Sequence, residues 1–424
     1  MAGRIAGATR DTFRSFEIRN FRLFFAGQAV SQVGNWLTLV AQTLLVLRLT
    51  GSGVAVGLLT AFQFGPVLLL GAWAGLIADR SDKRTLLMRV QTLAMGRSFA
   101  LAALAFMDEP PLAGLFAVAL VGGVATAFDN PARRSFVVEM VPETHVQNAV
   151  SLNSALMTGS RVVGPALAGL LVTTVGFGWA FLTDAVSYTA VLYGLWRMDP
   201  SKLRRPPVTA RARGQVRAGL RYLLGVPELR VSLTMMAIIG TLAFNFQVVF
   251  PLFVSRSLGG SDATFTILLS VTSIGSLIGA LATARRTTVA VADVVLSAAG
   301  FGVAMLLMSA VPSVAVALPV SLLVGFTSIA FMTSSTALVQ LRADPSMRGR
   351  VLAVQAMVFL GSTPIGGPLL GWLCERYGAR LGLVVGGVAC LVAAAWGLSE
   401  TRAAARRAAV PALTLPPDVD VHAA

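Results

Sequence analysis

Polar side chains that could bind a substrate or a proton stand inside long apolar stretches of the chain, where each is costly and therefore informative. Two glutamines and an asparagine come first, at spacings of four and three residues, so a helix would place all three on one face. That face suits a cavity wall that hydrogen-bonds a substrate, and helix packing is the alternative. With three ionisable residues further along the chain, the candidates are Gln28, Gln32, Asn35, Arg97, Arg161 and Asp184.

The three ionisable candidates differ in the partners that the sequence offers them. In an apolar layer of about 30 Å, the depths of Arg97 and Asp184 differ by about 7 Å or less, which a long arginine side chain can bridge. Either the two form a structural ion pair, or Asp184 carries protons. Arg161 lies near mid-membrane with no acid within a helical turn, and it either binds an anionic substrate or extends into a wet cavity.

The composition indicates what kind of protein holds these groups. Of the 424 residues, 12% are charged and 55% are hydrophobic, and the mean hydropathy is +0.76. Because soluble domains are about 25% charged, this balance excludes a soluble enzyme and predicts an all-α polytopic membrane protein. Two cysteines and two histidines are too few and too far apart for a metal site, and no phosphate-binding loop for ATP is present, so we expect no cofactor.

Twelve apolar stretches are each long enough to cross a bilayer. The loops on the N-terminal side hold 28 Lys and Arg residues and the opposite loops hold four, which predicts that both termini are cytoplasmic and that the chain lies in the cell (inner) membrane. This rule accounts for the net charge of +15 without nucleic acid as a partner. The expected spans are 21–47, 54–78, 86–106, 112–128, 148–174, 178–197, 231–255, 263–284, 289–311, 314–340, 351–373 and 381–398.

The longest hydrophilic stretch separates six spans from six, and part of it, GQVRAGLRYLL, is expected to form a surface helix. The segments 159–170 and 361–372 share Gly, Ser, Gly and Gly at a constant offset of 202 residues. Two related six-helix halves predict a transporter with its substrate site between them. The expected parts are a cytoplasmic segment 1–20, an N-terminal half 21–197, a linker 198–230, a C-terminal half 231–398 and a cytoplasmic tail 399–424.

A charged turn, GLIADRSDKRTLL (75–87), joins the second and third expected spans. It places an acid where the N-terminus of a neighbouring helix could stabilise it, beside basic groups that could meet a carboxylate or a lipid phosphate. An ordinary basic turn at the cytoplasmic surface is the alternative.

This turn resembles the loop between helices two and three of the major facilitator superfamily. Gly75, Asp79, Arg80, Lys83 and Arg84 match that loop, whereas Asp82 replaces its second glycine, a change that we attribute to the tolerance of Asp for left-handed backbone geometry. The resemblance implies a twelve-helix fold and a latch in which the acid caps the eleventh helix and the arginine pairs with an acid on helix four. Asp129 stands where that partner is expected.

Two further segments, 28–59 and 128–153, resemble the branch of this superfamily that includes enterobactin exporters and drug-proton antiporters of group three. The likeness is good in the N-terminal half and only general in the C-terminal half. In the fifth span, GSRVVGPALAG resembles the glycine-proline motif of antiporters, which implies export; the alternative is simple close packing of helices. The matching residues are Gly159, Gly164, Pro165 and Gly169.

These observations favour a monomeric secondary exporter of a small amphipathic molecule, such as a siderophore-like product or a drug, driven by protons. Lysophospholipid transport is the alternative, since some members of the branch carry such lipids. A membrane enzyme is the remote third candidate, because only Asp184 is strongly placed inside the bundle. Branch members often have an acid at the position of Asn35, so its absence argues against proton coupling through the first span. Asp184 is the main buried candidate for the proton carrier, and Asp129 and Asp293 are candidates nearer the cytoplasmic surface.

Overall fold

The computed structural model describes residues 13–204, 215–284 and 288–409, and every regular element in these ranges is a helix. The N half consists of η1 (Arg14–Glu17), α2 (Arg19–Thr50), α3 (Gly53–Arg80), α4 (Lys83–Ala105), α5 (Leu112–Glu139), α6 (Glu143–Thr174) and α7 (Phe177–Arg197). Between the halves in sequence lie η2 (Pro200–Lys202) and α8 (Gln215–Gly225). The C half consists of α9 (Pro227–Leu242), α10 (Phe246–Ser257), α11 (Asp262–Ala284), α12 (Val291–Ala310), α13 (Val314–Arg342), α14 (Pro345–Tyr377) and α15 (Ala379–Ala409).

A helix lies over every expected span, but the stretch 231–255 is broken into α9 and α10. The break falls at residues 243–245, where the Asn245 side chain donates to the Thr241 carbonyl over 2.8 Å. The Asn245 carbonyl then accepts from the amides of Val248 and Val249, which begins a new helix. An asparagine that bonds the local backbone in this way competes with the regular helix, and the apolar pattern of the stretch does not reveal it.

Within the described residues, ten segments are long and apolar enough to cross a membrane. The helices α4 and α7 are not among them, although they pack in the same bundle and complete the predicted twelve-span architecture. These two helices carry Arg97 and Asp184, and they pack against each other. The helix α4 therefore supplies a cation for Asp184, and α7 supplies an acid for Arg97.

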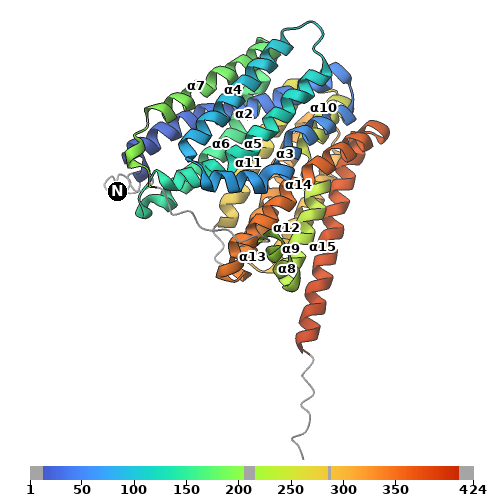
Figure 1. The fold of residues 1–424 in the computed structure, drawn as a ribbon. Helices are drawn as coiled ribbons and strands as arrows, with labels where there is room; N and C mark the ends of the chain where they lie inside the picture. Colours follow the sequence, from blue (N-terminus) through green and yellow to red (C-terminus); the bar gives the residue numbers. More distant parts are fainter. Residues whose placement is uncertain (1–12, 205–214, 285–287, 410–424) are drawn as a thin grey trace, which may run out of the picture.

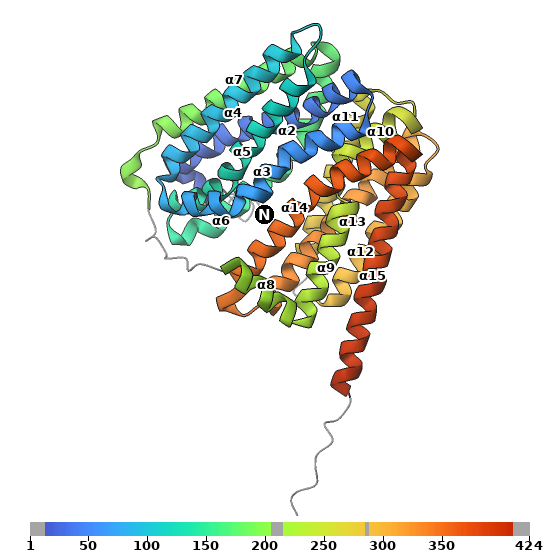
Figure 2. The ribbon, with the colours of Figure 1, turned by 45° about the vertical axis from the view of Figure 1, so that its right-hand side comes forward.

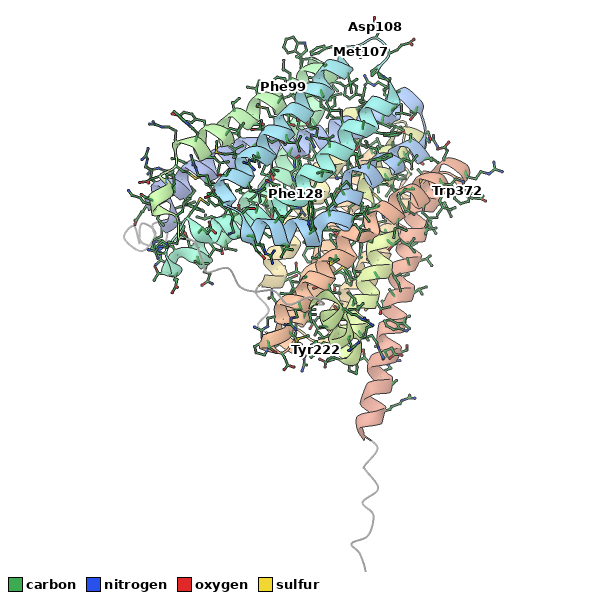
Figure 3. The ribbon with its side chains drawn as sticks, in the orientation of Figure 1. Phe99, Met107, Asp108, Phe128, Tyr222 and Trp372 are labelled. Carbon is green, nitrogen blue, oxygen red and sulfur yellow. The ribbon has the colours of Figure 1, made fainter. Side chains whose placement is uncertain are left out.

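The two halves meet at one end of the molecule, which we call the closed end, and diverge toward the other, which we call the diverging end, as Figures 1 and 2 show. The diverging end bears the start of the N half, α8 and the C-terminal end of α15. Where the halves meet, α3 packs on α14 and α6 packs on α11. In Figure 3, Trp372 on α14 lies toward the closed end and Tyr222 on α8 lies at the opposite end.

Glycines allow the two halves to approach closely at the closed end. A Cβ atom added to Gly57 on α3 would stand 2.5 Å from the carbonyl oxygen of Gly367 on α14, and one added to Gly53 would stand 2.5 Å from that of Gly371. Any larger residue would therefore push the helices apart. Gly371 is one of the glycines shared by the two copies of the repeat, and Gly367 lies in the second copy where the first has Pro165, so this segment forms the contact between halves.

The linker contains the expected surface helix, α8. It packs against the first turns of α14, where Tyr222 and Asp344 share a hydrogen bond of 3.1 Å and where Gly219 lies against Arg350. The helix is thus attached to the C half at the diverging end (Figure 2).

Candidate functional site

The Arg97–Asp184 pair is buried inside the N half. Arg97 Nη2 lies 3.6 Å from Asp184 Oδ2, and the Asp184 side chain is 0% exposed. The hydroxyls of Thr38 and Ser98 donate to the same carboxylate oxygen over 2.6 and 2.7 Å. Two hydroxyl groups donate to this carboxylate, so its charge is compensated by hydrogen bonds as well as by the arginine.

Two glycines make room for this pair. A Cβ atom on Gly122 of α5 would lie 2.7 Å from Arg97 Cδ, and one on Gly34 of α2 would collide with the Asp184 carboxylate. Neither position tolerates a side chain while the pair is formed. The pair therefore depends on small residues from two helices that do not carry it.

A polar cavity of about 60 Å³ lies next to the pair, inside the N half. Side chains from α2, α4, α5 and α7 line it, and they include Gln32 and Asn35, two of the three polar residues expected on one face of α2. The volume is enough for one or two water molecules or for a proton path, and not for a drug-sized molecule. Its polar lining consists of Gln32, Asn35, Gln91, Arg97, Thr126, Asp129, Asn130, Arg133 and Tyr188.

Asp129 lies on the wall of this cavity and not at the turn between α3 and α4. It forms an ion pair with Arg133, one helical turn further along α5, and it accepts a hydrogen bond of 2.7 Å from Gln91 on α4. Arg133 also contacts the sulfur of Met157 on α6, to which Gln32 donates over 2.8 Å. The structure thus assigns Asp129 a partner other than the expected Arg80.

The acid on α5 that does meet the charged turn is Glu139, near the end of the helix. Lys83 Nζ lies 2.7 Å from Glu139 Oε1, and both side chains are buried. Sequence analysis missed Glu139 because the expected span ended at residue 128, whereas α5 continues through a Pro131 turn to Glu139. The available signal was the spacing of Ala132, Phe136 and Met140, which follow one another at four residues and are all buried.

The remaining residues of the turn hold helix ends. Asp82 caps α4 by accepting from the Thr85 amide over 2.8 Å, with φ −63°, so the left-handed geometry expected at this position does not occur. Arg84 donates to the carbonyls of Leu195 and Trp196 at the end of α7 over 2.6 and 3.0 Å. Gly75 and Asp79 lie in the last two turns of α3, and the Arg80 side chain is exposed at its end.

The glycine-proline motif of α6 faces two other helices. Gly164 lies against Trp36 and the backbone of α2, and Gly169 lies against Thr266 of α11, in the other half. Pro165 is buried between them, whereas a Cβ atom on Gly159 would meet nothing within 4 Å. Two of the three motif glycines therefore serve close approach, one of them across the interface between the halves.

The last two candidates lie outside the cavity. Arg161 is exposed, and its guanidinium carbon lies 5.3 Å from the centre of the Trp36 ring on α2. Gln28 is buried, and neither atom of its amide has a hydrogen-bond partner among the described residues. The predicted stripe on α2 is therefore divided: Gln32 and Asn35 face the cavity and Gln28 does not.

Polar contacts that the sequence did not indicate join the halves at the closed end. The Glu375 carboxylate on α14 accepts from Ser52 Oγ over 2.6 Å and from the Val54 amide over 3.0 Å, which caps the start of α3. Arg48 Nη2 lies 2.6 Å from Asp262 Oδ2. The only indication of these contacts in the sequence was a few charged residues in the short loops on the side of the membrane opposite the basic loops.

Among the described residues, no group of three or more His, Cys, Asp or Glu side chains could hold a metal ion. The arrangement consists instead of buried acid–arginine pairs, a small polar cavity and a glycine-rich interface between two helical halves.

A family model of the major facilitator type, described as "Transmembrane secretion effector", matches residues 10–421. The chain belongs to this family. It is a secondary transporter of the major facilitator superfamily and a multi-pass membrane protein, and not an enzyme, as the sequence resemblance implied.

Several relatives and solved structures resemble this transporter. An MFS-type transporter YfiS of Bacillus subtilis is 28% identical over 62% of this chain and 63% of its own length. The staphyloferrin A transporter of Staphylococcus aureus is 24% identical over 84% of this chain and 90% of its own length. The macrolide efflux protein A of Streptococcus pyogenes is 22% identical over 90% of this chain and 96% of its own length. The fold matches an inward-facing, occupied bacterial homolog of the human lysosomal transporter Spinster, with TM-score 0.70, 16% identity and coverage of 92% and 97%.

Proposed function

We propose that this transporter exports a small amphipathic molecule, of the siderophore or drug class, across the cell membrane in exchange for protons. The relatives support the substrate class, because one is a staphyloferrin A transporter and another a macrolide efflux protein. The observation that carries the exchange mechanism is the cavity in the N half, whose wall holds an acid and an arginine in contact.

The proposed orientation puts both termini in the cytoplasm, as the 28 basic residues in the loops on that side favour. The diverging end of the bundle then faces the cytoplasm, and the structure corresponds to the inward-facing state of a monomer (Figure 1). An exporter collects its substrate in this state. The contacts of Glu375 and Arg48 would close the outer side.

Two kinds of side chain favour an amphipathic cargo. In the N half, Arg161 is exposed over Trp36 and offers a positive charge to an anionic group. In the C half, half-buried aromatic rings gather beside the break between α9 and α10: Phe244 lies 5.2 Å from Phe359 and 6.0 Å from Phe246, centre to centre. A molecule with a polar and an apolar end matches this pair of surfaces.

Asp129 is the proposed proton carrier. It lies on the cavity wall, where water and protons have access, whereas Asp184 is fully enclosed and has Thr38, Ser98 and Arg97 as partners. Protonation of Asp129 would remove its attraction for Arg133 and leave the guanidinium able to move. Loss of the proton would restore the ion pair, so that the charge state of one carboxyl selects between two arrangements of α5.

Transport into inside-out vesicles tests this proposal. Vesicles with an acidic interior should accumulate a carboxylate siderophore or a macrolide, and Asp129→Asn should abolish the accumulation while the protein stays in the membrane. Asp293→Asn is the matched control, because Asp293 accepts from the Ala290 amide at the start of α12 in the other half and the amide oxygen of asparagine can accept the same bond. Accumulation that ignores the pH gradient would reject proton exchange.

A further inference from the structure

A groove of about 520 Å³ runs along the outside of the N half, between α4 and α5. The helix α4 packs on α3, α5 and α7, all in the N half, so the groove between α4 and α5 faces the surrounding lipid. Figure 3 shows the exposed Phe99 on the same helix. The groove is lined largely by small and apolar side chains, including Thr92, Leu93, Gly96, Ala100, Val118 and Val121.

Arg89 supplies a positive charge at one end of this groove. Its side chain is exposed, and among the described residues none forms an ion pair or a hydrogen bond with it. The two basic residues at the start of α4 are already engaged, Lys83 by Glu139 and Arg84 by backbone carbonyls. Arg89 lies six residues into the helix, about 9 Å from its start, where a guanidinium reaches the headgroups of a bilayer.

The middle of the groove is open because Gly96 has no side chain. A Cβ atom added there would meet nothing within 4 Å, so the space beside α4 is free for a flexible chain. Arg97 lines both this groove and the inner polar cavity, and its buried Nε has no hydrogen-bond partner among the described residues. A chain in the groove would therefore cover the outer side of the Arg97–Asp184 pair and keep water away from it.

We propose that the groove binds one anionic phospholipid of the leaflet that adjoins the basic loops, with its phosphate on Arg89 and an acyl chain along Gly96 and over Arg97. Arg89 binds the phosphate through two parallel hydrogen bonds, and its positive charge favours a headgroup that carries no compensating cation. The apolar lining and the free space at Gly96 select the chain. This lipid is a bound component of the protein and not the exported cargo, so the site is independent of the proposed export.

The test uses the full chain, purified in a mild detergent, with phosphatidylglycerol and phosphatidylcholine of equal chain length as probes. Native mass spectrometry should show about tenfold higher retention of phosphatidylglycerol, because the choline cation of phosphatidylcholine offsets the attraction of its phosphate for Arg89. Arg89→Gln should remove this preference, and Arg22→Gln, at an exposed arginine of α2 at the same end of the bundle, should keep it. Equal retention of the two lipids by the wild type, or an unchanged preference in Arg89→Gln, would overturn the proposal.

A second variant tests the place of the acyl chain. Gly96→Leu places a branched side chain in the groove, and its Cβ atom would meet nothing within 4 Å, so the protein should elute as a folded monomer and should lose phosphatidylglycerol about tenfold. Soluble glycerol phosphate should not compete in the wild type, because it has no chain to place in the groove. Full lipid retention by a folded Gly96→Leu variant, or displacement of the lipid by glycerol phosphate, would contradict the site.

Discussion

The Arg97 guanidinium on α4 lies 3.6 Å from the Asp184 carboxylate on α7, at a place where no part of the acid is exposed. Both helices are too polar to count as membrane spans by composition, and they pack on each other. The pair therefore explains how two such helices remain in the bundle: each charge is buried only because the other is present.

Replacing one member of this pair should destabilise the protein more than replacing both members. Arg97→Leu leaves an uncompensated carboxylate and should lower the free energy of unfolding by about 3–5 kcal/mol. The double variant Arg97→Leu with Asp184→Leu should recover a large part of that loss, because no charge stays buried. Denaturant titration in lipid micelles measures both; equal losses in the single and double variants would argue against the pair as the cause.

The contact between Lys83 and Glu139 should couple the charged turn to α5. Glu139→Gln leaves Lys83 buried without its acid and should lower both the melting temperature and transport, whereas Glu143→Gln, at an exposed glutamate one helix later, should change neither. A double-mutant cycle with Lys83→Gln should give a coupling energy of about 1–3 kcal/mol. Additive effects of the two substitutions would mean that the contact carries no coupling.

Glu375 should hold the closed end together. Glu375→Gln weakens the cap on α3 by about 1 kcal/mol and should shift the balance toward the open outer side by roughly fivefold. Spin labels at Leu49 and Tyr377, both exposed on opposite halves, should report a larger population at long distance. Arg376→Gln, at the next and exposed residue, is the control; identical distance distributions in the two variants would refute the role of Glu375.

The two ends of the glycine-proline motif should respond differently to larger residues. Gly169→Ile would push Thr266 and the C half away from α6, so efflux should fall about tenfold or more at equal expression. Gly159→Ala adds a methyl group into open space and should leave efflux unchanged. Comparable losses in both variants would show that the motif acts through helix propensity and not through contact between the halves.

Helix existence was predictable because apolar length and the alternation of basic loops depend on the bilayer and not on side-chain detail. The Arg97–Asp184 pair was predictable for the same reason, since two isolated charges at similar depths have few other partners. The end of α5 was not predictable, because a helix can continue beyond the apolar layer. The break before Phe246 was not predictable either, because an asparagine can end a helix within that layer.

The partners of the charged turn could not be predicted from spacing. Asp129 and Glu139 are both acids on α5, about 15 Å apart along its axis, and the point at which α5 ends decides which one reaches Lys83 and which one lies at the cavity. The contacts of Glu375 with Ser52 and Val54 depend on how the two halves approach each other, and the sequence contains no local pattern for that contact.

Proton movement during transport tests the central claim most directly. The purified protein is reconstituted into liposomes that contain a pH-sensitive dye, and substrate is added on the side reached by the cytoplasmic loops. The account predicts that wild-type protein moves protons against the substrate flux and that Asp129→Asn moves neither, while Asp293→Asn behaves as wild type. Substrate flux without any proton movement in the wild type, or full coupled movement in Asp129→Asn, would contradict it.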